Sequence, residues 1–112
     1  MFPSPSPDQL DIAFSALAHP ARRAMLRTLA LRPASVGQLA SEHQISLPAI
    51  HKHIRLLEEA ELIQRKKVGR TNFVALRRSG LVAAQSWLGQ FQAFWGSDAE
   101  TLENYISNLL DN

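Results

Sequence analysis

The stretch Ser46–Leu62, SLPAIHKHIRLLEEAEL, constrains the fold of this chain more than any other segment. Ser46 can cap a helix N-terminus, and Pro48 falls in the first turn, where its missing N–H is not needed. Apolar residues then recur with a period close to 3.6, at Leu47, Ile50, Ile54, Leu57 and Ala60. The opposite face is basic in its first half and acidic in its second half. The stretch therefore predicts one amphipathic helix whose basic half suits insertion into a DNA major groove.

The charges of the chain are unevenly distributed. The formal net charge of the 112 residues is only +2, but all twelve Lys and Arg residues lie between Arg22 and Arg78. Only four acids lie in that span, so its net charge is twelve minus four, or +8, and the flanks contain the other six acids. This asymmetry favours a centre that binds a polyanion, although arginines and lysines that merely solvate helix surfaces would give the same pattern.

Length and composition restrict the class of protein. Residues 1–7, rich in proline and serine, are expected to form a disordered arm, and residues 8–112 a single domain with a small core that gains from association. No apolar run approaches the roughly 18 residues of a membrane span, and the N-terminus lacks the pattern of a signal peptide. The chain has no cysteine, which excludes disulfides and thiolate metal sites and fits a reducing compartment. We therefore expect a cytoplasmic protein, and no Ser/His/Asp or paired-carboxylate spacing indicates an enzyme.

The residues before Ser46 predict helices only. Periodic apolar residues place these helices over residues 8–18, 20–31 and 36–43. The three arginines of the second helix are expected to face outward. Ser35 and Gln38 form a capping-box pattern at the start of the third helix. This short helix and the one after Ser46 together predict a helix-turn-helix over residues 35–62.

The residues after the helix-turn-helix predict a hairpin and more helix. Residues 62–76 are rich in β-branched and basic residues and predict a β-hairpin with its turn at Gly69. Residues 79–111 return to helical periodicity, first over Ser79–Trp95 and then in a final amphipathic helix that a capping-box pattern opens. The sequence leaves open whether Gly96 breaks this segment into two helices.

This order of elements resembles the winged-helix fold, and the sequence is similar to the ArsR family of bacterial transcriptional repressors. The matching stretches are ALAHPARRAMLRTL, SVGQLASEHQISLPAIHKHIRLLEEAELI and KKVGRTNFVAL, which together span roughly Phe14–Leu76. The resemblance implies a mainly α fold with a small β-hairpin, in which the hairpin is the wing and the terminal helices dimerise. It also implies a homodimer that binds double-stranded DNA at an inverted-repeat operator as a repressor, although an activator remains possible.

The resemblance carries two sets of functional residues over to this sequence. The residues expected to contact DNA are Ser35, Gln38, Ser46, Leu47, Pro48, His51, Lys52, Arg55, Lys67, Arg70 and Thr71. The residues expected at the dimer interface are Leu10, Phe14, Leu17, Leu81, Ala84, Leu88, Phe91 and Trp95. Within the first set, His51 and Lys52 can hydrogen-bond base edges, whereas Leu47 and Pro48 can touch only thymine methyl groups or sugars. Arg55 is better suited to a phosphate.

The chain departs from the family pattern at two places. The thiolate pair of metal-sensing relatives falls here at Ser35 and Gly37, and their Asp/His pairs are absent from Leu81–Trp95. We therefore expect no metal site of the kinds known in the family, and no cofactor. Glu61 stands where the family usually has a glycine that ends the recognition helix. A left-handed backbone there would cost about 1 kcal/mol.

Alternatives remain for the histidines and for the function. His19 is expected to start a helix and His53 to be partly buried and hydrogen-bonded, while His51 either faces the DNA groove or is solvated. The aromatic stripe Trp87, Phe91, Phe94 and Trp95 is expected to form core or dimer interface, but it could also line a pocket for an unknown small hydrophobic inducer. The rival function is a winged-helix module that binds protein instead of DNA.

Overall fold

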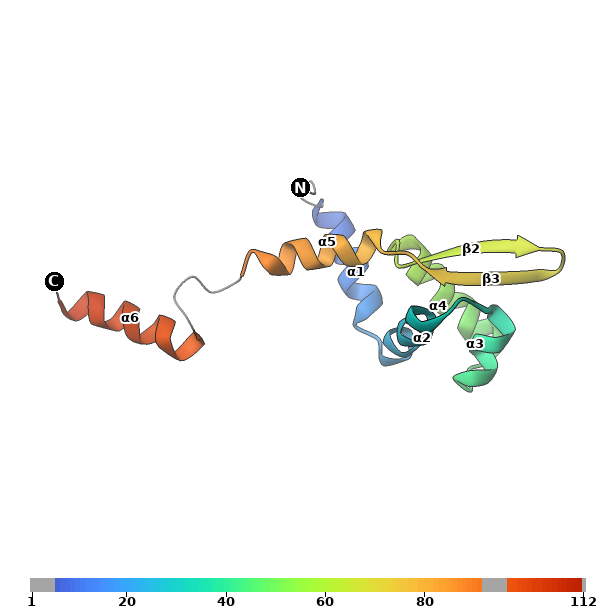
Figure 1. Cartoon of the computed structure of the whole chain (residues 1–112), viewed down its shortest axis with the longest axis horizontal. Helices are drawn as coiled ribbons and strands as arrows, with labels where there is room; N and C mark the ends of the chain where they lie inside the picture. Colours follow the sequence, from blue (N-terminus) through green and yellow to red (C-terminus); the bar gives the residue numbers. More distant parts are fainter. Residues whose placement is uncertain (1–5, 92–96, 112) are drawn as a thin grey trace.

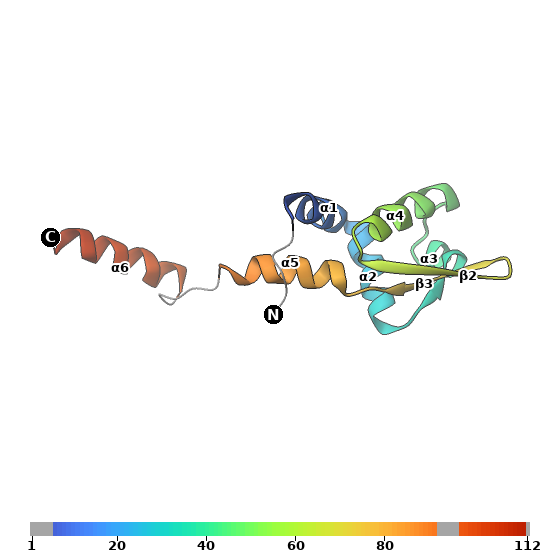
Figure 2. The ribbon, with the colours of Figure 1, turned by 90° about the horizontal axis from the view of Figure 1, so that it is seen from above.

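The fold is that of a computed structural model, which describes residues 6–91 and 97–111 (Figure 1). Its elements are α1 (Pro7–Leu17), α2 (Pro20–Leu31), β1 (Ala34–Ser35), α3 (Val36–Glu42), α4 (Leu47–Glu59), β2 (Ile63–Val68), β3 (Thr71–Leu76), α5 (Ser79–Gly89) and α6 (Asp98–Leu110). Figures 1 and 2 show α1 to α4 gathered at the base of the β2–β3 hairpin, which extends at one end, while α5 and α6 extend at the other. This is the predicted winged helix-turn-helix. None of the helices in these described ranges is long and apolar enough to cross a bilayer.

The predicted hairpin is confirmed and is joined by a third strand. β2 pairs antiparallel with β3 from Ile63↔Leu76 to Val68↔Thr71, and Gly69 turns the chain with a φ of 62°. The sequence did not predict β1, whose two residues pair with β3 at Ala34↔Val74. A two-residue strand is too short to show a period of two, so only the neighbouring strand defines it.

The core lies between α2, α3, α4 and the inner face of the sheet. The largest side chains that are almost completely buried are Met25, Leu39, Ile50, Ile54, Leu57, Leu62, Ile63 and Val74. The amphipathic helix predicted after Ser46 is therefore confirmed as α4, with one exception. Leu47, the first residue of the apolar series, is 56% exposed and does not join the core.

Capping serines fix where α1, α3 and α4 begin. Ser35 and Gln38 form the predicted capping box of α3, with Ser35 Oγ accepting from the Gln38 N–H at 3.1 Å and Gln38 Oε1 accepting from the Ser35 N–H at 2.9 Å. Ser46 Oγ accepts from the Ala49 N–H at 3.4 Å. Ser6 forms another capping box, so α1 begins at Pro7 within the segment expected to be a disordered arm. Residues 1–5 of that arm lie outside the described residues.

Arg22 is buried, which corrects the expectation that the arginines of α2 face outward. Its side chain is only 9% exposed. Arg22 Nε donates to the Ala16 carbonyl at 2.8 Å, and Nη2 donates to the Ser15 carbonyl at 3.1 Å. Both carbonyls lie in the last turn of α1, where a helix offers few backbone donors. Ser15 also accepts from the Ala18 N–H at 3.3 Å, and the guanidinium supplies a further donor to each carbonyl. Arg22 thus attaches the end of α1 to α2.

The C-terminal region also differs from expectation. α5 ends at Gly89, earlier than the predicted Trp95, and Phe91 lies in a turn. Trp95 and Gly96 lie outside the described residues, and so does the position at which the sequence left a break between two helices open. The predicted final helix is confirmed as α6, and Ser97 and Glu100 form its capping box. No residue of α6 is buried.

Candidate nucleic-acid interface

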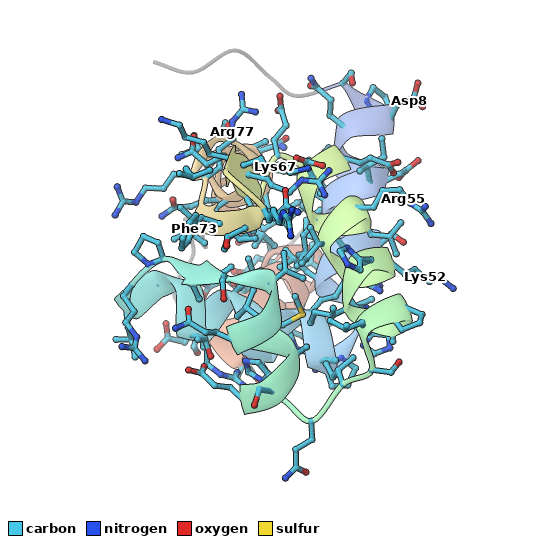
Figure 3. The ribbon with its side chains drawn as sticks, turned by 90° about the vertical axis from the view of Figure 1, so that its right-hand side faces the viewer. Asp8, Lys52, Arg55, Lys67, Phe73 and Arg77 are labelled. Carbon is cyan, nitrogen blue, oxygen red and sulfur yellow. The ribbon has the colours of Figure 1, made fainter. Side chains whose placement is uncertain are left out.

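The exposed face of α4 carries cations that point away from the protein. His51, Lys52 and Arg55 are all exposed. Figure 3 looks at the end of the molecule that carries the hairpin, and it shows Lys52 and Arg55 projecting outward from α4. In the part of the chain that the structure describes, neither side chain takes part in an ion pair. Both charges are therefore available to an external anion.

The hairpin presents a second group of basic side chains. Lys67, Arg70 and Thr71 are exposed at its outer half. Arg65 instead pairs with Glu58 of α4 at 3.0 Å, which ties β2 to the recognition helix. Because side chains two residues apart in a strand share a face, Lys67 lies on the same face as Arg65 and so on the α4 side of the hairpin. Lys67 thus lies on the side of the hairpin that faces α4.

A groove of about 360 Å³ lies where α3, α4 and the hairpin meet. Its lining residues are Ser35, Val36, Gly37, Leu47, His51, Arg70, Thr71 and Asn72. The structure therefore brings together five of the residues predicted to contact DNA, from three separate elements. The other six, Gln38, Ser46, Pro48, Lys52, Arg55 and Lys67, are exposed but lie outside this lining. Asn72 was missed, because an asparagine in a strand carries no charge or motif that marks it.

His53 is half-buried and hydrogen-bonded, as predicted, and it connects α4 to the corner between α1 and α2. Its Nδ1 lies 3.3 Å from Arg22 Nη1. A guanidinium can only donate, so the Nδ1 atom of His53 must accept and cannot carry a proton in this contact. Burial lowers the pKa of His53 from its ordinary value of 6.5, and electrostatic interactions with His19, Arg22 and Lys52 lower it further. The neutral ring therefore helps to hold the recognition helix in place.

His19 has the expected role at the start of a helix. Its Nδ1 accepts from the Ala21 N–H at 3.1 Å and caps α2. The rings of His19 and His53 lie 4.8 Å apart between centroids. Within residues 6–91 and 97–111, no group of three or more His, Asp or Glu side chains is arranged to hold a metal ion.

The residues predicted to form the dimer interface divide into two groups. Leu10, Phe14, Leu17 and Leu81 are half-buried and Ala84 is buried within the chain itself. The ring of Phe14 in α1 meets that of Trp87 in α5 edge-on at 5.5 Å, so the contact between these helices already covers part of their apolar surface. Leu88 and Phe91 are 55% and 66% exposed and are free to meet a partner. Trp95 lies outside the described residues.

Comparisons with known proteins agree on one kind of protein. A family model for a helix-turn-helix domain matches residues 17–65. The chain is 36% identical over 86 residues to the HTH-type transcriptional regulator Rv2034 of Mycobacterium tuberculosis, which covers 77% of this chain and 78% of the relative. It is also 30% identical over 78 residues to the transcriptional repressor SdpR of Bacillus subtilis. This match covers 70% of this chain and 87% of the relative.

Solved structures share the fold. A crystal structure of an ArsR family transcriptional regulator, RHA00566, superimposes with a TM-score of 0.76 at 38% identity, covering 83% of this chain and 96% of that chain. HlyU from Vibrio cholerae superimposes with a TM-score of 0.61 at 27% identity, covering 72% and 87%. A homodimeric winged helix-turn-helix DNA-binding domain of Mb0332 from Mycobacterium bovis, at 21% identity and a TM-score of 0.61 over 72% and 73% of the two chains, shares the fold.

Proposed function

Because the chain belongs to the ArsR family of winged helix-turn-helix transcriptional regulators, we propose that it is a repressor that binds an inverted-repeat operator as a homodimer. Its regulatory role and its DNA-binding domain follow from the family, and the chain is not an enzyme. One observation carries the finer proposal. Exposed basic side chains of α4 and of the hairpin lie at one end of the molecule, where His51 and Arg70 line a groove between the two elements. The positive charge of this surface is complementary to the negative charge of a DNA duplex, and its exposed helix suits the major groove.

The residues of this surface take different roles on DNA. His51 and Lys52 lie in the first half of α4, where side chains of a recognition helix reach base edges in the major groove. Leu47 is exposed beside them and supplies an apolar contact to a thymine methyl group or a sugar. Arg55 binds a phosphate, and the hairpin cations follow the adjacent backbone or minor groove. Base preference therefore rests mainly on His51 and Lys52.

The exposed apolar surface supports dimerisation. Leu88 and Phe91 at the end of α5 are exposed. α6 exposes a further apolar stripe made of Leu102, Tyr105, Ile106, Leu109 and Leu110. An isolated helix of 13 residues is marginally stable in water, so α6 needs a surface to pack on. A second copy would supply it and would place the two recognition helices about 34 Å apart on successive major-groove segments.

The regulator is further proposed to act in the cytoplasm and without the metal sites known in its family. The chain has no cysteine, and Ser35 and Gly37 stand at the positions of the family's thiolate pair. Ser35 is committed to capping α3. The hydroxyl of Ser35 is a weak metal ligand and Gly37 has no side chain, so these two positions supply no strong metal-binding group.

The test of this proposal compares two variants on duplex DNA. Lys52→Ala should cost roughly 1–3 kcal/mol and relax base preference, whereas Arg70→Ala should weaken all sequences alike and lower the salt slope by about one. Arg27→Ala, which removes an exposed charge from α2, serves as the control and should bind like the parent. The measurement is a mobility-shift titration against DNA from upstream of the reading frame and against mixed-sequence duplex.

The same titration separates the rival functions. Binding that depends steeply on salt supports DNA as the partner, because each cation that meets a phosphate releases counterions. A weak response that does not change with salt would favour a winged-helix module that binds protein. Parental binding by both Lys52→Ala and Arg70→Ala would show that the assigned DNA face is wrong.

A further inference from the structure

The groove between α3, α4 and the hairpin has the chemistry of an anion site. Two of its lining side chains, His51 and Arg70, are basic, and Thr71 and Asn72 add a hydroxyl and an amide. None of the eight lining residues is acidic. Phosphate oxygens of nucleic acid accept hydrogen bonds from these side-chain types. The groove is therefore suited to a phosphate and contains no charge that would repel one.

Asn72 lies in this groove without a partner inside the protein. It sits on the same face of β3 as the buried Val74, directly opposite Lys67 of β2. It is half-buried, and its side chain makes no hydrogen bond to any other residue that the structure describes. Among the described residues, no side-chain nitrogen or oxygen is buried without a partner, so the amide of Asn72 remains open to solvent in the groove. A phosphate in the groove could therefore accept a hydrogen bond from it in place of water.

Gly37 is the second residue of α3, and nothing inside the protein explains a glycine there. A Cβ atom built at Gly37 meets no atom within 4 Å, and the backbone has no positive φ. Glycine in a helix is less stable than alanine, so this position lowers the stability of α3. Gly80 is different, because a Cβ there would overlap the Ala60 carbonyl oxygen. The missing side chain of Gly37 thus leaves open space in the wall of the groove.

We propose that this groove seats one phosphate of the DNA backbone, with Asn72 as an additional DNA-contacting residue and Gly37 as the residue that keeps the seat open. Arg70, Thr71 and Asn72 hold the phosphate from the hairpin, and His51 reaches it or the adjacent sugar from α4. The inference rests on the proposed function, since DNA must first lie against this end of the molecule. The inference goes beyond the proposed function because it assigns the groove to a single phosphate of the DNA backbone and gives Asn72 and Gly37 a role in binding that phosphate.

The proposed seat predicts an effect that differs from that of a base contact. Contacts to phosphate fix the register of a protein on DNA but carry no sequence information. Filling the seat should therefore weaken binding to every duplex by the same factor. A protein that loses Lys52 should instead lose its preference among sequences.

The central experiment pairs Gly37→Ala with Ser41→Ala. Both changes raise the helix propensity of α3, and Ser41 is exposed and outside the groove. Both variants should unfold at a temperature equal to or above that of the parent. In fluorescence-anisotropy titrations with a labelled mixed-sequence duplex of about 30 base pairs, long enough for two half-sites, Gly37→Ala should bind roughly three- to tenfold more weakly. Ser41→Ala should bind like the parent.

Asn72 gives an independent readout. Asn72→Ala should weaken binding to upstream and mixed-sequence duplexes equally, and Asn72→Asp should weaken it further because a carboxylate repels phosphate. Parental affinity of Gly37→Ala and Asn72→Asp, together with weakened binding by Arg55→Ala, would overturn the phosphate seat and leave the proposed function intact. Failure of the parent to bind either duplex at low salt would overturn both.

Discussion

Replacing Arg22 with methionine tests how α1 is held to the rest of the domain. The guanidinium donates to the carbonyls of Ser15 and Ala16 and to the Nδ1 atom of His53. Methionine keeps an unbranched apolar stem of similar reach but removes all of these donors. The free energy of unfolding should therefore fall, and the size of the fall can be worked out from the surroundings of each acceptor.

The two carbonyls differ in their access to water. Ala16 is buried, so water cannot easily replace the donor that its carbonyl loses, and a hydrogen bond from a charged donor is worth about 1.5–3 kcal/mol. Ser15 is exposed, so a water molecule can replace the guanidinium there and the loss should stay below about 1 kcal/mol. The expected loss for Arg22→Met is therefore about 2–4 kcal/mol.

The neighbouring arginine provides a matched control. Arg23 Nη1 donates to the Leu17 carbonyl at 2.8 Å, at the same helix end, but its side chain is exposed. Water can replace this donor, so Arg23→Met should cost no more than about 1 kcal/mol. Urea unfolding measures both variants at one protomer concentration, because the proposed dimerisation would make apparent stability depend on concentration. Equal losses for the two variants would refute the argument that burial of the acceptor sets the cost.

Three further predictions concern single positions. The lowered pKa of His53 means that, as the pH falls, the unfolded chain takes up this proton before the folded chain does. Its contribution to stability is therefore present above 6.5, its ordinary pKa, and is lost as the pH falls toward the lower folded value. His53→Gln should remove this part of the pH dependence in urea unfolding between about pH 7.5 and 5.5. Glu61 has a φ of 58°, so Glu61→Gly should stabilise the protein by up to about 1 kcal/mol, less the small contribution of its exposed ion pair with Arg77. A loss of stability would show that the left-handed backbone is not strained. Gly80→Ala should cost about 3 kcal/mol or more, because its Cβ would overlap a backbone carbonyl. Gly89→Ala, whose Cβ meets nothing within 4 Å, is the control in the same thermal-unfolding measurement and should not destabilise.

The parts of the fold that local chemistry decides could be predicted from the sequence. The capping serine, the early proline and the apolar period define α4 within a single stretch, and the turn at Gly69 defines the hairpin. β1 could not be found in the same way, because Ala34 pairs with Val74 and only the folded chain brings them together. The end of α5 was placed too late because the apolar stripe continues past Gly89, where the helix ends.

The candidate site was only partly predictable for a related physical reason. The sequence shows which side chains are cationic. It does not show which of these side chains pair with a carboxylate or a carbonyl elsewhere in the folded chain. Arg65 looked like its neighbours in the hairpin, yet it pairs with Glu58. Arg22 looked like a surface residue, yet it satisfies carbonyls from another helix. Asn72 could be identified only once the register of β3 placed it in the groove.

Two contacts add to the core packing that positions the recognition helix beside the proposed DNA-binding surface. His53 holds one side of α4 to Arg22 at the α1–α2 corner, and Glu58 holds β2 through Arg65. The acidic second half of α4 is therefore not simply a solvated face, because one of its carboxylates positions the hairpin. Because the buried residues of α4 and Ile63 of β2 also share one core, the fold itself builds the groove between α4 and the hairpin. A preformed groove avoids the cost of ordering these elements on binding, so more of the contact energy is available for affinity. Glu58→Gln should therefore weaken DNA binding even though it removes a negative charge, and tighter binding in a salt-controlled titration would contradict this expectation.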